Sequence, residues 1–190
     1  QFAKTYGDDA GGGAVVLSAN YQDLRNISVF QYHTISEDFN IADGFIPYTG
    51  YRGWFGFTDF FGPWRKGPWS SYDYGIYGIA WDHQDGSRYQ RGFGAFGTLT
   101  SRSDWRFSVS QDYAVIDGTV DSTYMVSATM GATNRFRKIG LGVTVGTLAS
   151  EPSTYLTPNA SVRLFRRLDL AYSGALLNFQ GTTRQHVLTA

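Results

Sequence analysis

The three histidines are the residues of this chain with the widest range of possible chemistry, either as metal ligands or as general bases. They are His33, His83 and His186, and no two of them have the short spacing of a metal-binding motif. A Ser-His-Asp set assembled from separate strands stays open, but the chain has no Gly-x-Ser-x-Gly nucleophile elbow. The absence of cysteine excludes disulfides and thiolate metal sites. We therefore expect isolated histidines, no metal site, no cofactor and no catalytic residues.

A glycine-rich segment, Gly92-Phe-Gly-Ala-Phe-Gly97, has the composition of a phosphate-binding loop. Such a loop needs a helix directly after it, because the helix N-terminus holds the phosphate. Here the residues alternate with period two, which predicts a strand. We expect no nucleotide site at this segment.

One local cluster carries groups that could bind a planar ligand: Trp64, Arg65, Lys66 and Trp69, in a segment that also holds two prolines. Exposed Trp and Arg side chains stack on sugars and other planar partners. The same residue types form an interfacial anchor when Trp lies at a membrane surface and the basic side chain extends into water. We favour the anchor, and a ligand site is the alternative.

Three charged residues, Arg106, Asp112 and Asp169, alternate with apolar neighbours and so share the polar side of their expected strands. On the inner face of a barrel such residues line a conducting lumen or form a closed polar network in a filled interior. The sequence favours neither arrangement over the other.

The elements that must position these residues are strands, and residues 139–148 show this most clearly. Ile139, Leu141, Val143 and Val145 alternate with glycine and threonine. Period two predicts a strand with one apolar face. In a soluble protein the second face would carry charged residues, but here it carries almost none. The pattern is typical of a barrel strand that faces lipid on one side.

The same alternation recurs along the chain after an N-terminal loop at residues 1–11, and it is interrupted at residues 38–47 and 62–69. We expect strands at 12–22, 27–37, 48–61, 71–83, 88–100, 105–116, 122–133, 139–148, up to 165, 168–179 and from 185 onward.

The lengths of these strands and turns point to a membrane barrel. Strands of about 10–14 residues exceed the usual globular length and match the 9–11 residues needed to cross a bilayer at a tilt. We expect short turns at 85–86, 101–104, 134–135 and 166–167 and longer loops at 62–70, 117–121 and 149–154. Short turns on one side and longer loops on the other are typical of outer-membrane barrels.

The composition agrees with this class. Of the 190 residues, 17% are charged, below the roughly 25% of soluble domains. Aromatic residues are 17% and glycine accounts for 23 positions, which suits tight turns and aromatic girdles. The 16 basic residues balance the 16 acidic ones, so we expect no nucleic acid held by bulk electrostatics.

Residues 38–61 carry a motif that resembles a known family. Asp38-Phe39-Asn40, Gly44-Phe45-Ile46-Pro47 and Tyr51-Arg52 are similar to a family of large bacterial outer-membrane proteins of unknown function. Its members join an N-terminal domain resembling family-nine carbohydrate-binding modules to a long C-terminal β-barrel. The resemblance covers about 25 residues plus the hairpin rhythm that all such barrels share. It implies that this chain is the C-terminal part of that barrel, and it implies no catalytic residues.

We therefore expect an all-β fold: an antiparallel up-and-down transmembrane β-barrel, of which residues 1–190 form one segment with about ten or eleven strands. Because bacterial single-chain barrels have an even strand number, we expect additional strands beside the first and the last.

The expected function is passage of solutes across the bacterial outer membrane, or scaffolding in this Gram-negative envelope, without catalysis. The expected partners are membrane lipid and either the remaining barrel strands or another envelope protein. The alternatives are a soluble all-β carbohydrate-binding or interaction module and, ranked lower, an outer-membrane barrel enzyme.

Overall fold

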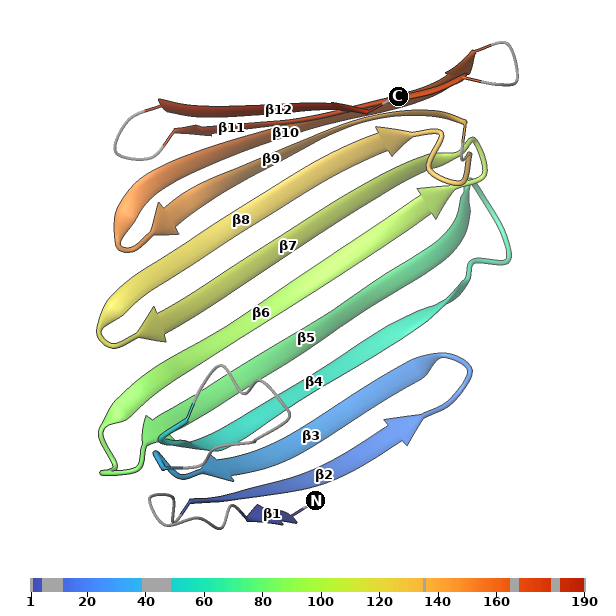
Figure 1. The fold of residues 1–190 in the computed structure, drawn as a ribbon. Coiled ribbons are helices and arrows are strands. Elements are labelled where there is room, and N and C mark those ends of the chain that lie inside the picture. The colour runs from blue at the N-terminus through green and yellow to red at the C-terminus, as the bar shows by residue number, and fades with distance from the viewer. Residues whose placement is uncertain are drawn as a thin grey trace.

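The computed structural model consists of a single antiparallel β-sheet of twelve strands (Figure 1). It describes residues 2–4, 12–38, 49–134, 136–164, 168–178 and 182–189. The strands are β1 (Phe2–Lys4), β2 (Gly13–Gln22), β3 (Asn26–Ile35), β4 (Tyr51–Pro63), β5 (Trp69–His83), β6 (Arg88–Ser101), β7 (Trp105–Ile116), β8 (Thr119–Met130), β9 (Arg137–Leu148), β10 (Glu151–Leu164), β11 (Leu168–Asn178) and β12 (Thr182–Thr189).

Each strand pairs with its neighbours in the sequence, so the order in the sheet runs from β1 to β12 without a crossover. The predicted all-β, antiparallel, up-and-down architecture is thereby confirmed. In Figure 1 the strands form one layer, and no other described element packs on either side of it. The described residues include no helix that is long and apolar enough to span a membrane.

The sheet is open. Among the described residues, no ladder joins β1 or β2 to β11 or β12. A closed barrel is therefore not part of the observed structure.

The first eleven residues, which the sequence predicts to be a loop, contain the short strand β1. Phe2, Ala3 and Lys4 pair with Val15, Ala14 and Gly13. The predicted interruption at 38–47 falls almost entirely on residues 39–48, outside the described part of the chain. The same residues hold most of the motif that resembles the outer-membrane family.

The turns occupy two ends of the sheet. Those after β2, β4, β6 and β8 lie at one end, together with the last residues of β10; this is here called the Trp64 end and is on the right in Figure 1. Those after β5, β7 and β9 lie at the other, the His83 end, together with the last residues of β3 and β11. The prediction of longer loops at 117–121 and 149–154 is wrong, because only residues 117–118 and 149–150 separate the strands there. Both tight turns share the His83 end with the long connection between β3 and β4, residues 36–50, so long and short connections do not segregate by side.

Prolines also depart from expectation. The predicted loops at 62–70 and 149–154 are too long, because Pro63 ends β4 and Pro152 lies within β10. Pro158 lies in the middle of β10, where its ladder with β9 is continuous. The ladder with β11 skips Thr157 and Pro158, so the missing N–H of the proline removes no bond there.

The two faces of the sheet have unlike compositions. The apolar face is the one that carries Ile139, Leu141, Val143 and Val145 together with their cross-strand partners, such as Val126 and Leu156. The polar face is the one that carries Arg106, Ser108, Ser110 and Asp112. The alternation predicted for these strands is confirmed by the register.

Burial is reversed relative to a soluble protein. In β9, Ile139 and Leu141 are 55% and 50% exposed, whereas Gly140 and Gly142 on the polar face are buried. In β8 the Val126 and Tyr124 side chains are exposed while Thr123 and Ser127 are half-buried. No side chain among the described residues is fully buried.

The small core lies on the polar face, near the His83 end. It consists of Ala14, Ile35 and Tyr51, with Trp81 and Tyr89 packed against it. The Tyr51 and Trp81 rings stack with their centroids 4.7 Å apart. Closer packing on this face is the arrangement expected for the concave side of a curved sheet, where side chains converge.

Candidate functional site

The apolar face forms one continuous surface across the sheet. The row Val109, Val126, Val143 and Leu156 shows this, since each member pairs directly with the next across β7 to β10. Among strand residues with exposed large apolar side chains, all but Leu148 and Tyr155 lie on this face. An exposed apolar surface of this extent marks contact with lipid or with another protein.

Aromatic side chains lie toward both ends of the apolar face. At the Trp64 end, Phe60 stacks on Tyr74 at 5.4 Å and Trp105 on Phe107 at 5.9 Å between ring centroids. At the His83 end, Tyr32 and Trp54 lie 4.5 Å apart, and Phe93 lies 5.4 Å from Tyr113. Aliphatic residues such as Ile76, Val109 and Val126 lie between the two groups. This distribution is that of the aromatic girdles of membrane barrels.

The predicted cluster at residues 64–69 divides between the apolar face and the turn. The Trp64 ring meets Tyr72 edge-on at 6.0 Å, and Trp69 meets Phe107 edge-on at 6.1 Å. Arg65 and Lys66 lie in the turn and are exposed. Two rings against an apolar surface with two cations beyond them fit the anchor interpretation.

Arg102, from the neighbouring turn, holds this segment in place. Its Nε donates to the carbonyl of Gly67 at 3.0 Å, and its Nη2 donates to those of Trp64 and Arg65 at 3.0 and 3.1 Å. The backbone of residue 102 also donates to Pro68. Sequence reasoning missed Arg102, because only the pairing of β5 with β6 brings the two turns together.

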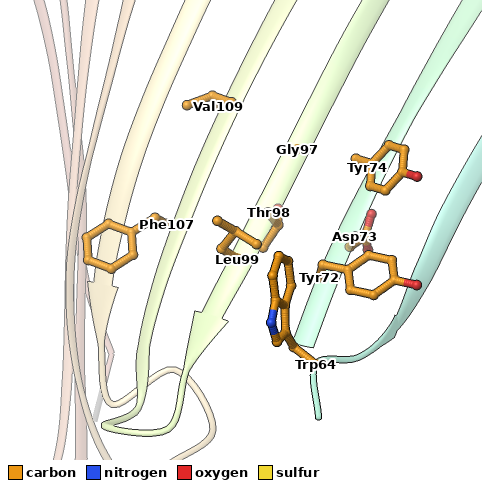
Figure 2. A pocket seen from close by; sticks show the side chains of 9 residues that line it. All are labelled: Trp64, Tyr72, Asp73, Tyr74, Gly97, Thr98, Leu99, Phe107 and Val109. Carbon is orange, nitrogen blue, oxygen red and sulfur yellow. The ribbon is translucent and has the colours of Figure 1, made fainter. Parts of the chain in front are cut away.

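A hollow of about 360 Å³ opens on the apolar face beside Trp64. Figure 2 shows Gly97 between two groups of side chains, with Tyr72 and Tyr74 on one side and Leu99, Phe107 and Val109 on the other. Trp64 lies at the end nearest the turn. The hollow exists because Gly97 has no side chain where its neighbours have large ones.

On the polar face the structure places all three predicted lumen residues. Arg106 is exposed and lines a hollow of about 540 Å³ together with Asp73, Ser108 and several threonines. Asp112 accepts a hydrogen bond from the Tyr77 hydroxyl. Asp169 forms an ion pair with Arg163 of the adjacent strand. The three share one face but not one site, since each has its own neighbours.

Two further carboxylates on the polar face, Asp59 and Asp73, were not singled out from the sequence. Each has a buried Oδ1 with no hydrogen-bond partner among the described residues. They lie on adjacent strands, where Asp59 is paired with Gly75 and Asp73 with Phe61. Only the pairing of β4 with β5 brings them together, so no local motif could have revealed them.

The histidines do not converge. His33 Nε2 lies 3.2 Å from the Gln31 side-chain oxygen. His83 Nε2 lies 3.2 Å from the Asp117 carboxylate, and the nearby Ser87 hydroxyl donates to Asp85 instead. The side chain of His186 lies outside the described residues. Within the part of the chain that is described, no three His, Asp or Glu residues are placed to hold a metal ion.

Acidic residues order several turns. Backbone and hydroxyl donors of Thr133 at 2.8 and 2.7 Å hold the pKa of the Asp104 carboxyl below its usual range. The Arg25 backbone N–H lowers the pKa of Asp23 in the same way, with the Tyr21 hydroxyl as the next contribution. Both carboxylates stabilise their turns in the ionised form.

No protein-family model, curated protein or solved structure matches this chain. The geometry of the sheet is therefore the basis for inferring the function.

Proposed function

We propose that this sheet is part of the wall of a β-barrel in a bacterial outer membrane. The apolar face would contact lipid and the polar face would line the interior. The observation that carries this proposal is the reversed burial along β8 and β9, where the apolar side chains are exposed and the polar ones are half-buried. In water the apolar face would have to be covered by a second layer of secondary structure, and the described residues form no such layer.

The lengths and girdles support the same proposal. Strands β2 to β11 have 10 to 15 residues, enough to cross a bilayer at a tilt. Aromatic rings lie at both ends of the apolar face, at the positions of the two membrane interfaces. The resemblance of residues 38–61 to the C-terminal barrel of large outer-membrane proteins points the same way.

The activity we propose is passage of solutes along the polar face, or scaffolding of the envelope, without catalysis. Among the described residues, β1 and β12 each pair on one side only, and lipid cannot satisfy the backbone groups of an open edge. We infer that further barrel strands or another envelope protein cover these edges in the membrane.

Reconstitution tests the proposal. The purified protein, refolded into phosphatidylcholine vesicles, should resist protease within its strands and should require detergent or lipid to stay monodisperse. A monodisperse monomer in plain buffer would instead favour the soluble carbohydrate-binding or interaction module. Planar-bilayer conductance of the full-length protein then separates a passage function from a scaffold, because only an open lumen conducts.

A further inference from the structure

The two ends of the sheet carry opposite charge although the whole chain is neutral. This comparison takes each turn together with the two flanking residues of each adjoining strand, within the described part of the chain. At the Trp64 end the basic residues are Arg25, Arg65, Lys66, Arg102, Arg106, Arg137, Lys138 and Arg163, against Asp23, Asp104 and Asp169. At the His83 end the acidic residues are Glu37, Asp38, Asp82, Asp85, Asp117 and Glu151, against Lys4, Arg52 and Arg88.

The basic end also holds one of the hollows of the apolar face. The hollow above Gly97 is lined almost wholly by apolar and aromatic side chains and opens onto the apolar face. Trp64 closes it toward the turn (Figure 2), and Arg65 and Lys66 follow directly in the sequence. A volume of about 360 Å³ lies within the range of small-molecule sites.

The two cations are available for a ligand. Arg102 uses its guanidinium to hold the carbonyls of the turn. Arg65 and Lys66 form no side-chain hydrogen bond or ion pair with another described residue. An apolar hollow with two free cations in the adjoining turn has the charge pattern of an anionic amphiphile.

We infer that the Trp64 end binds a membrane lipid with a phosphate-bearing anionic headgroup. One acyl chain lies in the hollow above Gly97, and the phosphate lies against Arg65 and Lys66. The inference rests on the proposed membrane location, because it requires the apolar face to meet lipid. It also gives the sheet an orientation, with the Trp64 end in the leaflet richer in anionic lipid.

Quenching of tryptophan fluorescence tests this with defined lipids. The protein is refolded into vesicles of phosphatidylcholine mixed with phosphatidylglycerol, with bromine on the acyl chains of only one of the two. Brominated phosphatidylglycerol should quench more strongly, and Trp64→Phe should remove most of the difference. Equal quenching by both lipids would overturn the lipid site while leaving membrane insertion intact. No quenching by either would instead count against the membrane location itself.

Variants that remove positive charge test whether Arg65 and Lys66 cause the preference for phosphatidylglycerol. Arg65→Gln with Lys66→Gln should weaken the preference for phosphatidylglycerol by about five-fold per residue removed. The matched control is Arg52→Gln with Arg88→Gln, which removes the same charge from the His83 end and should leave the preference unchanged. A similar loss in both pairs would show bulk attraction and would overturn the local site.

Filling the hollow tests its part in binding. A Cβ at Gly97 would meet Val109 at 3.8 Å and Tyr74 at 3.9 Å, which is ordinary contact, so Gly97→Leu should fold. Gly78→Leu is the control, because Gly78 lines a different hollow on the same face, and its Cβ would meet only the Gly92 carbonyl at 3.9 Å. Only Gly97→Leu should abolish the preferential quenching. Unchanged quenching in a folded Gly97→Leu protein would refute the placement of the acyl chain.

Discussion

Val126 gives the sharpest test of which solvent the apolar face meets. It lies on β8 between Val109 and Val143, in the aliphatic band between the two aromatic groups, and its side chain is 60% exposed. The next residue, Ser127, points to the polar face, where it pairs with Gly142 of β9. Val126→Arg and Ser127→Arg therefore add the same group to opposite faces at the same depth.

Val126→Arg should lower the free energy of unfolding by different amounts depending on whether this face meets lipid or water. Fully transferring a valine side chain out of water stabilises by about 1.5–3 kcal/mol. Because Val126 is 60% exposed, its replacement would remove about 1–2 kcal/mol of stabilisation if this face meets lipid. Placing the charge near the bilayer centre raises the total to about 2–4 kcal/mol. In water the same change falls within about 0.5 kcal/mol.

Equilibrium unfolding from phosphatidylcholine vesicles by guanidinium chloride measures the difference. Val126→Arg should lower the folding equilibrium constant by about thirty- to a thousand-fold. Ser127→Arg should change it by less than about five-fold, because the polar face meets water or polar groups. A Val126→Arg protein as stable as its Ser127→Arg counterpart would refute lipid contact at this face.

Three further predictions concern two turns and the end of β9. Asp104→Asn keeps a residue tolerant of the positive φ of 63° at this position but removes the carboxylate that accepts from Thr133. In the wild-type protein the Thr133 amide should stay protected from hydrogen exchange at pH values above the ordinary carboxyl pKa. It should lose this protection as the pH falls through the lowered pKa of Asp104. The variant should show no such acid transition. Gly146→Ala should destabilise by more than the about 1–2 kcal/mol of a left-handed backbone, because its Cβ would lie 1.8 Å from the Ser122 carbonyl. Gly118→Ala is the control for Gly146→Ala, because a Cβ at Gly118 would meet no atom within 4 Å. Denaturant unfolding compares the two variants. Arg102→Gln should accelerate trypsin cleavage after Arg65 and Lys66 by about ten-fold through the loss of three carbonyl contacts, while Arg25→Gln at the same end should leave the cleavage rate unchanged.

Strand faces could be predicted from the sequence because alternation is a local property. Ile139, Leu141, Val143 and Val145 lie on one face in any strand that contains them all. Turn geometry was less predictable. Asp85-Gly86 has the expected hairpin sequence but belongs to the four-residue connection 84–87. Asp117-Gly118, expected to begin a longer loop, forms the tight turn, with φ values of 47° and 81°.

The other tight turn shows why local sequence was not enough. Ala149 and Ser150 have φ values of 51° and 64°, although neither residue type favours this conformation. The continuous ladder between β9 and β10 fixes the length of the connection, and the backbone must accept the turn. Pro158 is a similar case, because Gly174 on β11 gives its ring space and the ladder is interrupted beside it.

The charge asymmetry could not be predicted from composition, because it depends on which end of the sheet each turn reaches. Arg65, Lys66 and Arg102 are far in the sequence from Arg137 and Lys138, and acidic turns such as the one with Asp117 lie between them. In an up-and-down sheet alternate turns share an end, so charges that alternate along the chain separate in space. A net charge of zero therefore coexists with a basic end and an acidic end. In the proposed membrane location the separation would also orient the sheet, since reversing it would place the acidic turns against the anionic headgroups that attract the basic ones.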